Sequence, residues 1–351
     1  MKAILREWSA TGLRGWNAFW FRPSDPATLG LIRILGGAML FYTHLVWSIQ
    51  WDAFFGEHPW LSAEAVALRQ ADSYEWSYLW HIGSPGLLWA AHLGALVIFA
   101  MLALGLYTRV ASILAFFIAV AYANRLPGAQ FGLDQINVLL AMYLMIGPSG
   151  AAYSLDRLVA RWRGRAGEPA APRVGATIAV RLIQLHMCII YLFAGLAKHE
   201  GLTWQNGTAI WGAAANLEYQ SLDITWLADH LYLVNILTHV TVFWELFYVA
   251  RVGPRFTRPI VIAMAVPLHL GIAFCMGMMT FGLVMIFANL AFVAPWLTRM
   301  FVDPVLTKMG SLLGLGHLLA APSAPTKKPE SQRRHRKPRG DRPQMTMPKP
   351  A

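Results

Sequence analysis

Charged residues are scarce in this sequence, and so are cysteines. Only 13% of the 351 residues are charged, whereas 56% are hydrophobic. Soluble globular domains contain about 25% charged residues, so much of this surface must face something other than water. The two cysteines, Cys188 and Cys275, both lie within apolar runs, which excludes a disulfide framework and a Cys-rich metal site. These absences exclude a soluble fold and predict an integral membrane protein in which no metal is expected.

The net charge of +11 is concentrated near the C-terminus. Residues 321–351 contain nine Lys and Arg residues against two acidic ones, together with many prolines. Such a segment cannot bury a core, so it is predicted to be a disordered tail whose partners are anionic lipid headgroups. The tail has no aromatic side chain that could stack on a base, so nucleic acid is not an expected partner.

Long apolar runs predict an all-α, polytopic transmembrane bundle. A bilayer core of about 30 Å requires about 20 apolar residues in a helix. The sequence contains about eight candidate spans, at 27–47, 84–106, 109–126, 131–149, 175–198, 231–250, 258–276 and 279–298. The predicted organisation is an interfacial N-terminal helix (1–24), a transmembrane domain (25–300), an amphipathic helix (301–320) and the basic tail (321–351). The amphipathic start is unlike a cleaved signal peptide, so none is expected.

Loop charges predict the orientation. The segments 48–83 and 199–230 are acidic, whereas residues 1–24, 150–174 and 251–258 are basic. Eight spans place every basic segment on one side of the membrane, so both termini are predicted to be cytoplasmic. The two acidic loops would face outside, and both are rich in tryptophan. Each tryptophan could simply anchor its loop at the interface, but so many of them favour loops that fold over the bundle as a lid or wall.

Ionisable groups inside apolar spans are costly and are therefore candidate functional residues. The candidates are Arg33, His44, His92, Asp134, Arg181, His186, His239, Glu245, His269, and Lys198 at the outer end of its span. Structural alternatives exist for each of them: Arg33 and Glu245 could form a buried ion pair, and Lys198 could snorkel from a helix end.

Helical geometry separates two of these candidates. His186 and Lys198 are twelve residues apart, which is about 18 Å along a helix axis and about 120° around it. They cannot share a proton directly. His186 is therefore assigned to packing or to a cofactor in mid-membrane, and Lys198 to the outer mouth. His92 and His239 are interpreted as packing residues.

Several strings resemble, in order, the membrane domain of the vitamin K-dependent γ-glutamyl carboxylase. They are DPATLGLIRILGGAMLF (25–41), LGLYTRVASILAFF (104–117), LLAMYLMIGPSGAAYSLDR (139–157), YLFAGLAKHEGLTWQNGTAIW (191–211) and HLGIAFCMGMMTFGLVMIFANLAFVAPWL (269–297). The resemblance covers residues 25–298, and on it the chain is identified as a member of the bacterial HTTM-domain proteins. It implies an integral protein of the bacterial cytoplasmic membrane.

The resemblance also implies a reaction. In the carboxylase, a lysine near the extracytoplasmic face acts as base on reduced vitamin K, and the oxygenated quinol then abstracts a γ-proton from glutamate before CO2 adds. Lys198 falls at the matching position, where burial would have to keep its amine usable as a base. His269 matches a histidine of the family and is a second catalytic candidate. His186, Trp204 and Trp211 are candidates for binding the quinol cofactor of this carbon–carbon lyase.

Three differences from the carboxylase leave the substrate open. The stretch FGLDQINVL (131–139) has Asp134 and Asn137 where the carboxylase has a histidine, and Ala197 replaces the second lysine of the pair. We also expect no large lumenal domain. Glutamate in a peptide is therefore not the expected substrate, although another extracytoplasmic carboxylate fits the chemistry.

Two hypotheses from other classes stand beside the enzyme. The first is a non-catalytic membrane protein of the same fold that binds a lipid or serves in assembly. The second is a b-type haem quinol protein, suggested by five histidines in or near the spans: His44, His92, His186, His239 and His269. No single span carries two histidines at the spacing typical of haem ligation, which disfavours the haem.

Overall fold

The computed structural model describes residues 2–56, 59–70, 72–165, 170–312 and 314, and the predicted basic tail lies outside these residues. Among them the structure contains helices and no β-strand. The α-helices are α1 (Lys2–Phe21), α2 (Ala27–Trp47), α3 (Trp51–Phe55), α4 (Ala63–Arg69), α5 (Pro85–Leu104), α6 (Thr108–Arg125), α7 (Gly132–Ile146), α8 (Leu155–Trp162), α9 (Val174–Glu200), α10 (Leu202–Gln205), α11 (Ala209–Ala214), α12 (Leu231–Val252), α13 (Arg258–Cys275), α14 (Met279–Asn289) and α15 (Pro295–Leu312). Short 3-10 turns are η1 (Tyr78–His81), η2 (Pro127–Ala129), η3 (Ser149–Ala151), η4 (Thr225–Asp229) and η5 (Leu290–Phe292). The all-α prediction is confirmed.

The chain is an integral membrane protein. Within the described residues, five helices are long and apolar enough to cross a bilayer: α2, α5, α9, α12 and α13. The segments Met279–Phe292 and Pro295–Leu312 together meet the same criterion but are bent by 120°, which gives up to six spans if the bent pair counts as one.

The predicted count of about eight spans is not confirmed, although a helix lies at each predicted position. The helix α7 is apolar but has only 15 residues, and α14 has only 11. The helix α6 reaches 18 residues but carries polar side chains along its length, among them Arg109, Ser112 and Asn124. Pro295 begins α15 after the break, since proline cannot continue the hydrogen-bond ladder of a preceding helix.

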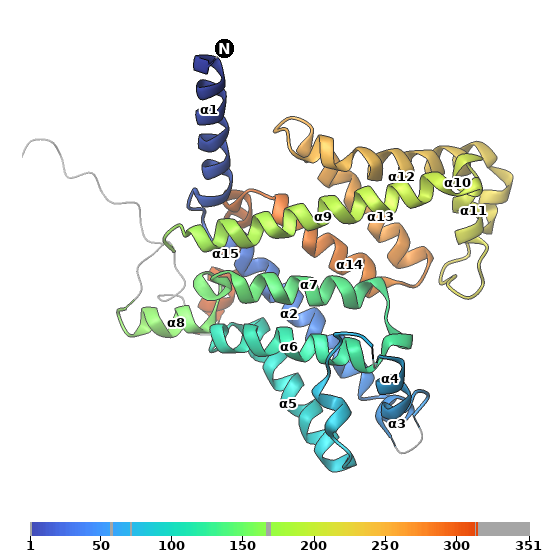
Figure 1. Ribbon diagram of the computed structural model, residues 1–351, viewed down its shortest axis with the longest axis horizontal. Helices are drawn as coiled ribbons and strands as arrows, with labels where there is room; N and C mark the ends of the chain where they lie inside the picture. Colours follow the sequence, from blue (N-terminus) through green and yellow to red (C-terminus); the bar gives the residue numbers. More distant parts are fainter. Residues whose placement is uncertain (1, 57–58, 71, 166–169, 313, 315–351) are drawn as a thin grey trace, which may run out of the picture.

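The acidic and basic connecting segments lie at opposite ends of the bundle. Figure 1 places α3, α4, α10 and α11 at one end, whereas α8 lies at the other. Helices α3 and α4 belong to the acidic loop 48–83, and α10 and α11 belong to the acidic loop 199–230. Helix α8 belongs to the basic segment 150–174. The charge separation expected from the sequence is therefore present in the fold, and the end that carries α10 and α11 is called the loop end below.

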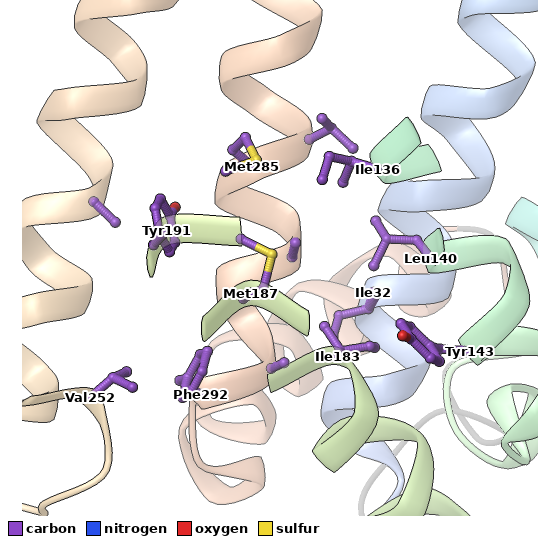
Figure 2. Packing of buried hydrophobic residues seen from close by; sticks show 14 of the residues in the cluster. Ile32, Ile136, Leu140, Tyr143, Ile183, Met187, Tyr191, Val252, Met285 and Phe292 are labelled. Atoms are coloured by element: carbon purple, nitrogen blue, oxygen red, sulfur yellow. The ribbon is translucent and has the colours of Figure 1, made fainter. Parts of the chain in front are cut away.

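The main hydrophobic core joins α2, α7, α9, α12, α13 and α14. Its buried members include Ile32, Ile136, Ile183 and Met285, and Figure 2 shows their side chains meeting between the helices. A second core lies between α2, α5 and α6 and contains Phe99. The α2–α5 contact is tight because a Cβ atom at Gly37 would lie 2.7 Å from the backbone nitrogen of Ala103.

Candidate functional site

Lys198 lies in the last turn of α9 and is held by Glu245 of α12. Its Nζ atom donates hydrogen bonds to both carboxylate oxygens of Glu245, over 2.7 Å to Oε2 and 3.0 Å to Oε1. The Lys198 side chain is 26% exposed, whereas that of Glu245 is 7% exposed. A carboxylate buried this deeply requires a compensating cation. The pair therefore sets a lysine amine near the loop end with a proton acceptor in direct contact.

Gly195 allows the two helices to approach closely enough for this contact. A Cβ atom at Gly195 would lie 2.8 Å from the backbone nitrogen of Leu246, the residue after Glu245. Small residues at a helix crossing let two backbones come together. The end of α9 is thereby brought against the turn of α12 that carries the carboxylate.

Trp204, in the short helix α10, covers the lysine. The N–H of Gly201 donates to the carbonyl of Lys198 over 3.0 Å, which ends α9 and turns the chain back. Lys198 Nζ lies 5.4 Å from the centroid of the Trp204 ring, within the range of a cation–π contact. The loop at 199–230 thus places one of its tryptophan rings against the lysine.

A chain of hydrogen bonds connects four buried residues of α12, α14, α9 and α13. The hydroxyl of Tyr248 donates to Asn289 Oδ1 over 2.6 Å, and Asn289 Nδ2 donates to the hydroxyl oxygen of Tyr191 over 2.7 Å. The Tyr191 hydroxyl lies 2.7 Å from His269 Nε2. The amide nitrogen of Asn289 cannot accept a hydrogen bond, so of these two partners only His269 Nε2 can accept the proton of the Tyr191 hydroxyl.

The donor–acceptor order of these hydrogen bonds determines which ring nitrogen of His269 carries the proton. A neutral imidazole that accepts at Nε2 carries its proton on Nδ1. His269 is 2% exposed, and its Nδ1 has no hydrogen-bond partner among the residues that the structure describes. The series of hydrogen bonds therefore ends in the buried Nδ1–H group of His269, which could donate to an oxygen atom of a ligand.

Packed aromatic rings connect the residues of this hydrogen-bond chain to an open groove. The Tyr191 ring lies 4.8 Å from that of Trp244 and 4.3 Å from that of Tyr248, measured between centroids. Trp244 and Tyr248 also line a groove of about 390 Å³ between α12 and α13, together with Phe243, Phe247 and Arg251. The groove is mostly apolar and has a single guanidinium among its lining residues.

The other residues proposed for cofactor binding lie apart from Lys198 in the packing of the bundle. His186 Nδ1 is hydrogen bonded to the hydroxyl of Tyr143 on α7 over 2.8 Å, in agreement with the prediction that His186 and Lys198 do not share a proton. Trp211 of α11 packs beside Ala214, Leu227 and Val234 in a small cluster at the loop end. Of the three candidates, Trp204 is the one in contact with Lys198.

The suggested ion pair between Arg33 and Glu245 is wrong. Glu245 is paired with Lys198, and Arg33 is fully buried elsewhere. Its Nη1 atom donates to the carbonyl of Leu102 over 3.1 Å, and its Nη2 atom donates to the carbonyl of Tyr153. Backbone carbonyls therefore take the place of the expected carboxylate, and Arg33 ties α2 to α5 and to the segment after α7.

Asp134 and Asn137 lie in the first two turns of α7. A carboxylate oxygen of Asp134 accepts a hydrogen bond from the backbone N–H of Phe131 over 2.9 Å, which caps the helix. Asn137 is 3% exposed, and both residues line a small, partly open cavity with His44 and Tyr122. They form a second polar centre, separate from the lysine pair.

The histidines fit a haem poorly. Both ring nitrogens of His92 are hydrogen bonded, to the hydroxyls of Ser48 and Tyr122, each over 2.8 Å. His186 and His269 each use one nitrogen toward a tyrosine.

The sequence reasoning missed Tyr191, Trp244, Tyr248 and Asn289. The candidates predicted from the sequence were charged or titratable groups inside apolar runs. These four side chains are uncharged, so they were not among the candidates. Their signal was nevertheless present, because buried hydroxyl and amide groups require hydrogen-bond partners. A search for neutral polar groups in the spans would have found them.

The sequence matches the HTTM domain over residues 21–296. No curated protein and no solved structure matches it significantly. The match covers the bundle from α2 to the start of α15, including the Lys198–Glu245 pair and the hydrogen-bond chain. The chain therefore belongs to the HTTM-domain family, whose domain is the membrane domain of vitamin K-dependent carboxylase-like proteins.

Proposed function

We propose that this protein is an integral membrane enzyme that uses Lys198 as a base, at the extracytoplasmic face, on a reduced quinone-type lipid. The observation that carries the proposal is the contact of Lys198 with the buried carboxylate of Glu245 beneath the Trp204 ring. A lysine that only snorkels would point its ammonium to water. Lys198 instead points to a carboxylate in the bundle and under an aromatic cover.

The pair can supply a free amine without a change in total charge. When the shared proton lies on Nζ, the pair is an ammonium and a carboxylate; when it lies on Glu245, the pair is an amine and a carboxylic acid. Burial penalises the charged arrangement relative to the neutral one. The amine of Lys198 could then take a proton from a bound hydroxyl group, with Glu245 holding the first proton.

The residues present fit a quinol. A quinol is a flat ring with hydroxyl groups and an apolar tail, and ligand pockets for molecules of drug size measure about 300–1,000 Å³. The groove of about 390 Å³ offers aromatic walls, but neither His269 nor Lys198 is among its lining residues. The Nδ1–H of His269, which has no partner among the described residues, is a separate donor for an oxygen. When bound, a reduced quinone would supply an acidic hydroxyl group and, with O2, the oxidation that drives the reaction.

We propose that the extracytoplasmic substrate is a carboxylate to which CO2 adds, as in the carboxylase. The topology required is the one predicted from loop charge, in which both termini are cytoplasmic and the loop end of the bundle faces outside. The acidic loops with α10 and α11 would then lie on the substrate side. The other expected partners are the bilayer and its lipid headgroups.

A non-catalytic protein that binds a lipid or serves in assembly is the second candidate function. It is favoured by the complete pairing of Lys198, since a bidentate ion pair covered by Trp204 also stabilises a helix crossing without any chemistry. Under this hypothesis the lysine could be exchanged for another cation. The two candidates therefore differ in what Lys198→Arg does.

The deciding experiment measures quinone retention and cellular function together. Wild type, Lys198→Arg, Lys198→Ala and Lys308→Ala are purified in mild detergent, and their bound lipids are extracted and identified by mass spectrometry. Lys308 is exposed on α15 and serves as the control. We expect a stoichiometric quinone with wild type and with Lys308→Ala.

In a strain that requires the gene, Lys198→Ala and Lys198→Arg should both fail to complement while the folded protein accumulates. Arginine keeps the charge but does not give up its proton, so failure of this variant indicates proton transfer. Complementation by Lys198→Arg would favour the structural role instead. Complementation by Lys198→Ala would end the proposal that this residue is catalytic.

A further inference from the structure

A second polar centre lies between α2, α6 and α7, apart from the lysine pair. It is built around His44 and Asn137, which are 5% and 3% exposed. Aromatic rings surround the imidazole of His44: the centroid of Phe99 lies at 4.5 Å, that of Tyr122 at 4.7 Å and that of Trp47 at 5.0 Å. A polar atom in such surroundings needs a partner to offset its loss of hydration.

The hydrogen bonds of His44 define which nitrogen is free. Its Nδ1 lies 2.8 Å from the carbonyl oxygen of Leu40. A carbonyl can only accept, so Nδ1 carries the proton and Nε2 of the neutral ring is an acceptor. Within the part of the chain that the structure describes, this Nε2 atom has no hydrogen-bond partner. His44 thus presents a buried lone pair.

Asn137, which lines the same cavity as His44, has a second buried acceptor. Its Oδ1 atom has no hydrogen-bond partner among the described residues. Both Asn137 and His44 line a small, partly open cavity of about 10 Å³, together with Asp134, Tyr122 and Trp47. A cavity needs about 10–15 Å³ of space for probe centres to hold one water molecule. The cavity and its two unpaired acceptors therefore match one molecule of that size.

We propose that a single ordered water molecule occupies this cavity and donates one hydrogen to His44 Nε2 and the other to Asn137 Oδ1. Two acceptors require a ligand with two donor hydrogens, and water is the smallest neutral molecule that has them. A metal ion is a poor alternative, because no group of three His, Cys, Asp or Glu residues among the described ones could hold one. A larger polar ligand exceeds the volume.

The water would add a hydrogen-bonded link between two helices, α2 and α7, that already pack against each other in the main core. His44 belongs to the outer part of α2 and Asn137 to the second turn of α7. A molecule that bonds to both would fix the approach of these two helices next to Tyr122 of α6. This site does not depend on the activity proposed for Lys198, so the two can fail separately.

The direct test is a map of the full-length protein in lipid nanodiscs at a resolution that reveals waters elsewhere in the bundle. We expect a density peak within hydrogen-bond distance of both His44 Nε2 and Asn137 Oδ1. An empty cavity would overturn the proposal. So would an amide of Asn137 turned to donate straight to His44.

A thermal-unfolding cycle supplies an independent test with His44→Phe, Asn137→Leu and the double variant. Each single change leaves one acceptor and the cavity, so each should lower the unfolding midpoint by about 2–4 °C. The double change removes both acceptors, so no unpaired acceptor remains in the cavity and its loss should be smaller than the sum of the single losses. Additive losses would contradict a shared water. The matched control pair is His81→Phe with Asn216→Leu, two exposed residues in different loops, for which small additive effects are expected.

Discussion

Replacement of Lys198 by methionine leaves Glu245 without the cation that contacts it. The Glu245 side chain is 7% exposed and cannot recover its hydration in place. Removing one partner of a buried ion pair costs about 3–5 kcal/mol, because the remaining charge is buried and uncompensated. The reverse change, Glu245→Leu, leaves an ammonium that is 26% exposed and can extend toward water. That change should cost about 1–2 kcal/mol, within the range for an unmade polar contact.

Loss of the Lys198 cation should therefore destabilise the protein more than loss of the Glu245 carboxylate. Equilibrium unfolding in mixed micelles gives the free energy of unfolding for wild type, Lys198→Met, Glu245→Leu and the double variant. We expect the double variant to be more stable than the lysine variant alone, with a coupling free energy of about 2–3 kcal/mol. Lys308→Met on the exposed face of α15 should stay within about 0.5 kcal/mol of wild type. Additive losses, or a larger loss from Glu245→Leu, would refute the reasoning.

Three further predictions follow from the packing and the hydrogen bonds. Gly195→Ala should lower the free energy of unfolding by about 1–3 kcal/mol, because its Cβ would lie 2.8 Å from a backbone nitrogen of α12; Gly94→Ala, with nothing within 4 Å, is the neutral control. Asn289→Leu leaves two buried tyrosine hydroxyls short of a partner and should cost about 1–3 kcal/mol for each, measured by the same unfolding assay. Burial raises the pKa of Tyr78, in the outer loop, to about 12, so the folded state keeps a proton that the unfolded chain loses near pH 10. Stability should therefore fall as the pH rises from 10 to 12, and Tyr78→Phe should lessen that fall.

The fold was predictable to the extent that it depends on apolar length. The runs at 27–47 and 231–250 became α2 and α12 with almost the same bounds, because a helix in lipid must satisfy its own backbone. The number of spans was not predictable in the same way. The run at 279–298 is broken by a 120° bend between Phe292 and Pro295, and hydropathy averaged over a window does not report the direction of a chain.

The candidate site was predictable one residue at a time but not as pairs. Lys198 was identified from its place at the end of a span and from the family resemblance, and the structure gives it a partner that is 47 residues away. Glu245 was identified as costly to bury, but it was assigned to Arg33 because both charges needed compensation. The choice between Arg33 and Lys198 depends on which helices cross, and Gly195 is the local feature that fixes that crossing.

The Trp204 ring that covers Lys198 should determine how strongly Lys198 and Glu245 attract each other. Attraction between two charges weakens as water reaches them, since the effective dielectric constant rises. Trp204 lies 5.4 Å from Lys198 Nζ and excludes water from the side of the outer loop. In a Trp204→Ala background, the coupling between Lys198 and Glu245 should fall to about half of its wild-type value, while the Lys198→Met variant alone becomes less damaging as water reaches the carboxylate. Trp226→Ala, which removes a tryptophan that is 52% exposed in the same loop, should leave the coupling unchanged. A coupling that is the same in both backgrounds would mean that the ring stabilises its loop without shielding the pair. The pair would then owe its strength to the helix crossing alone.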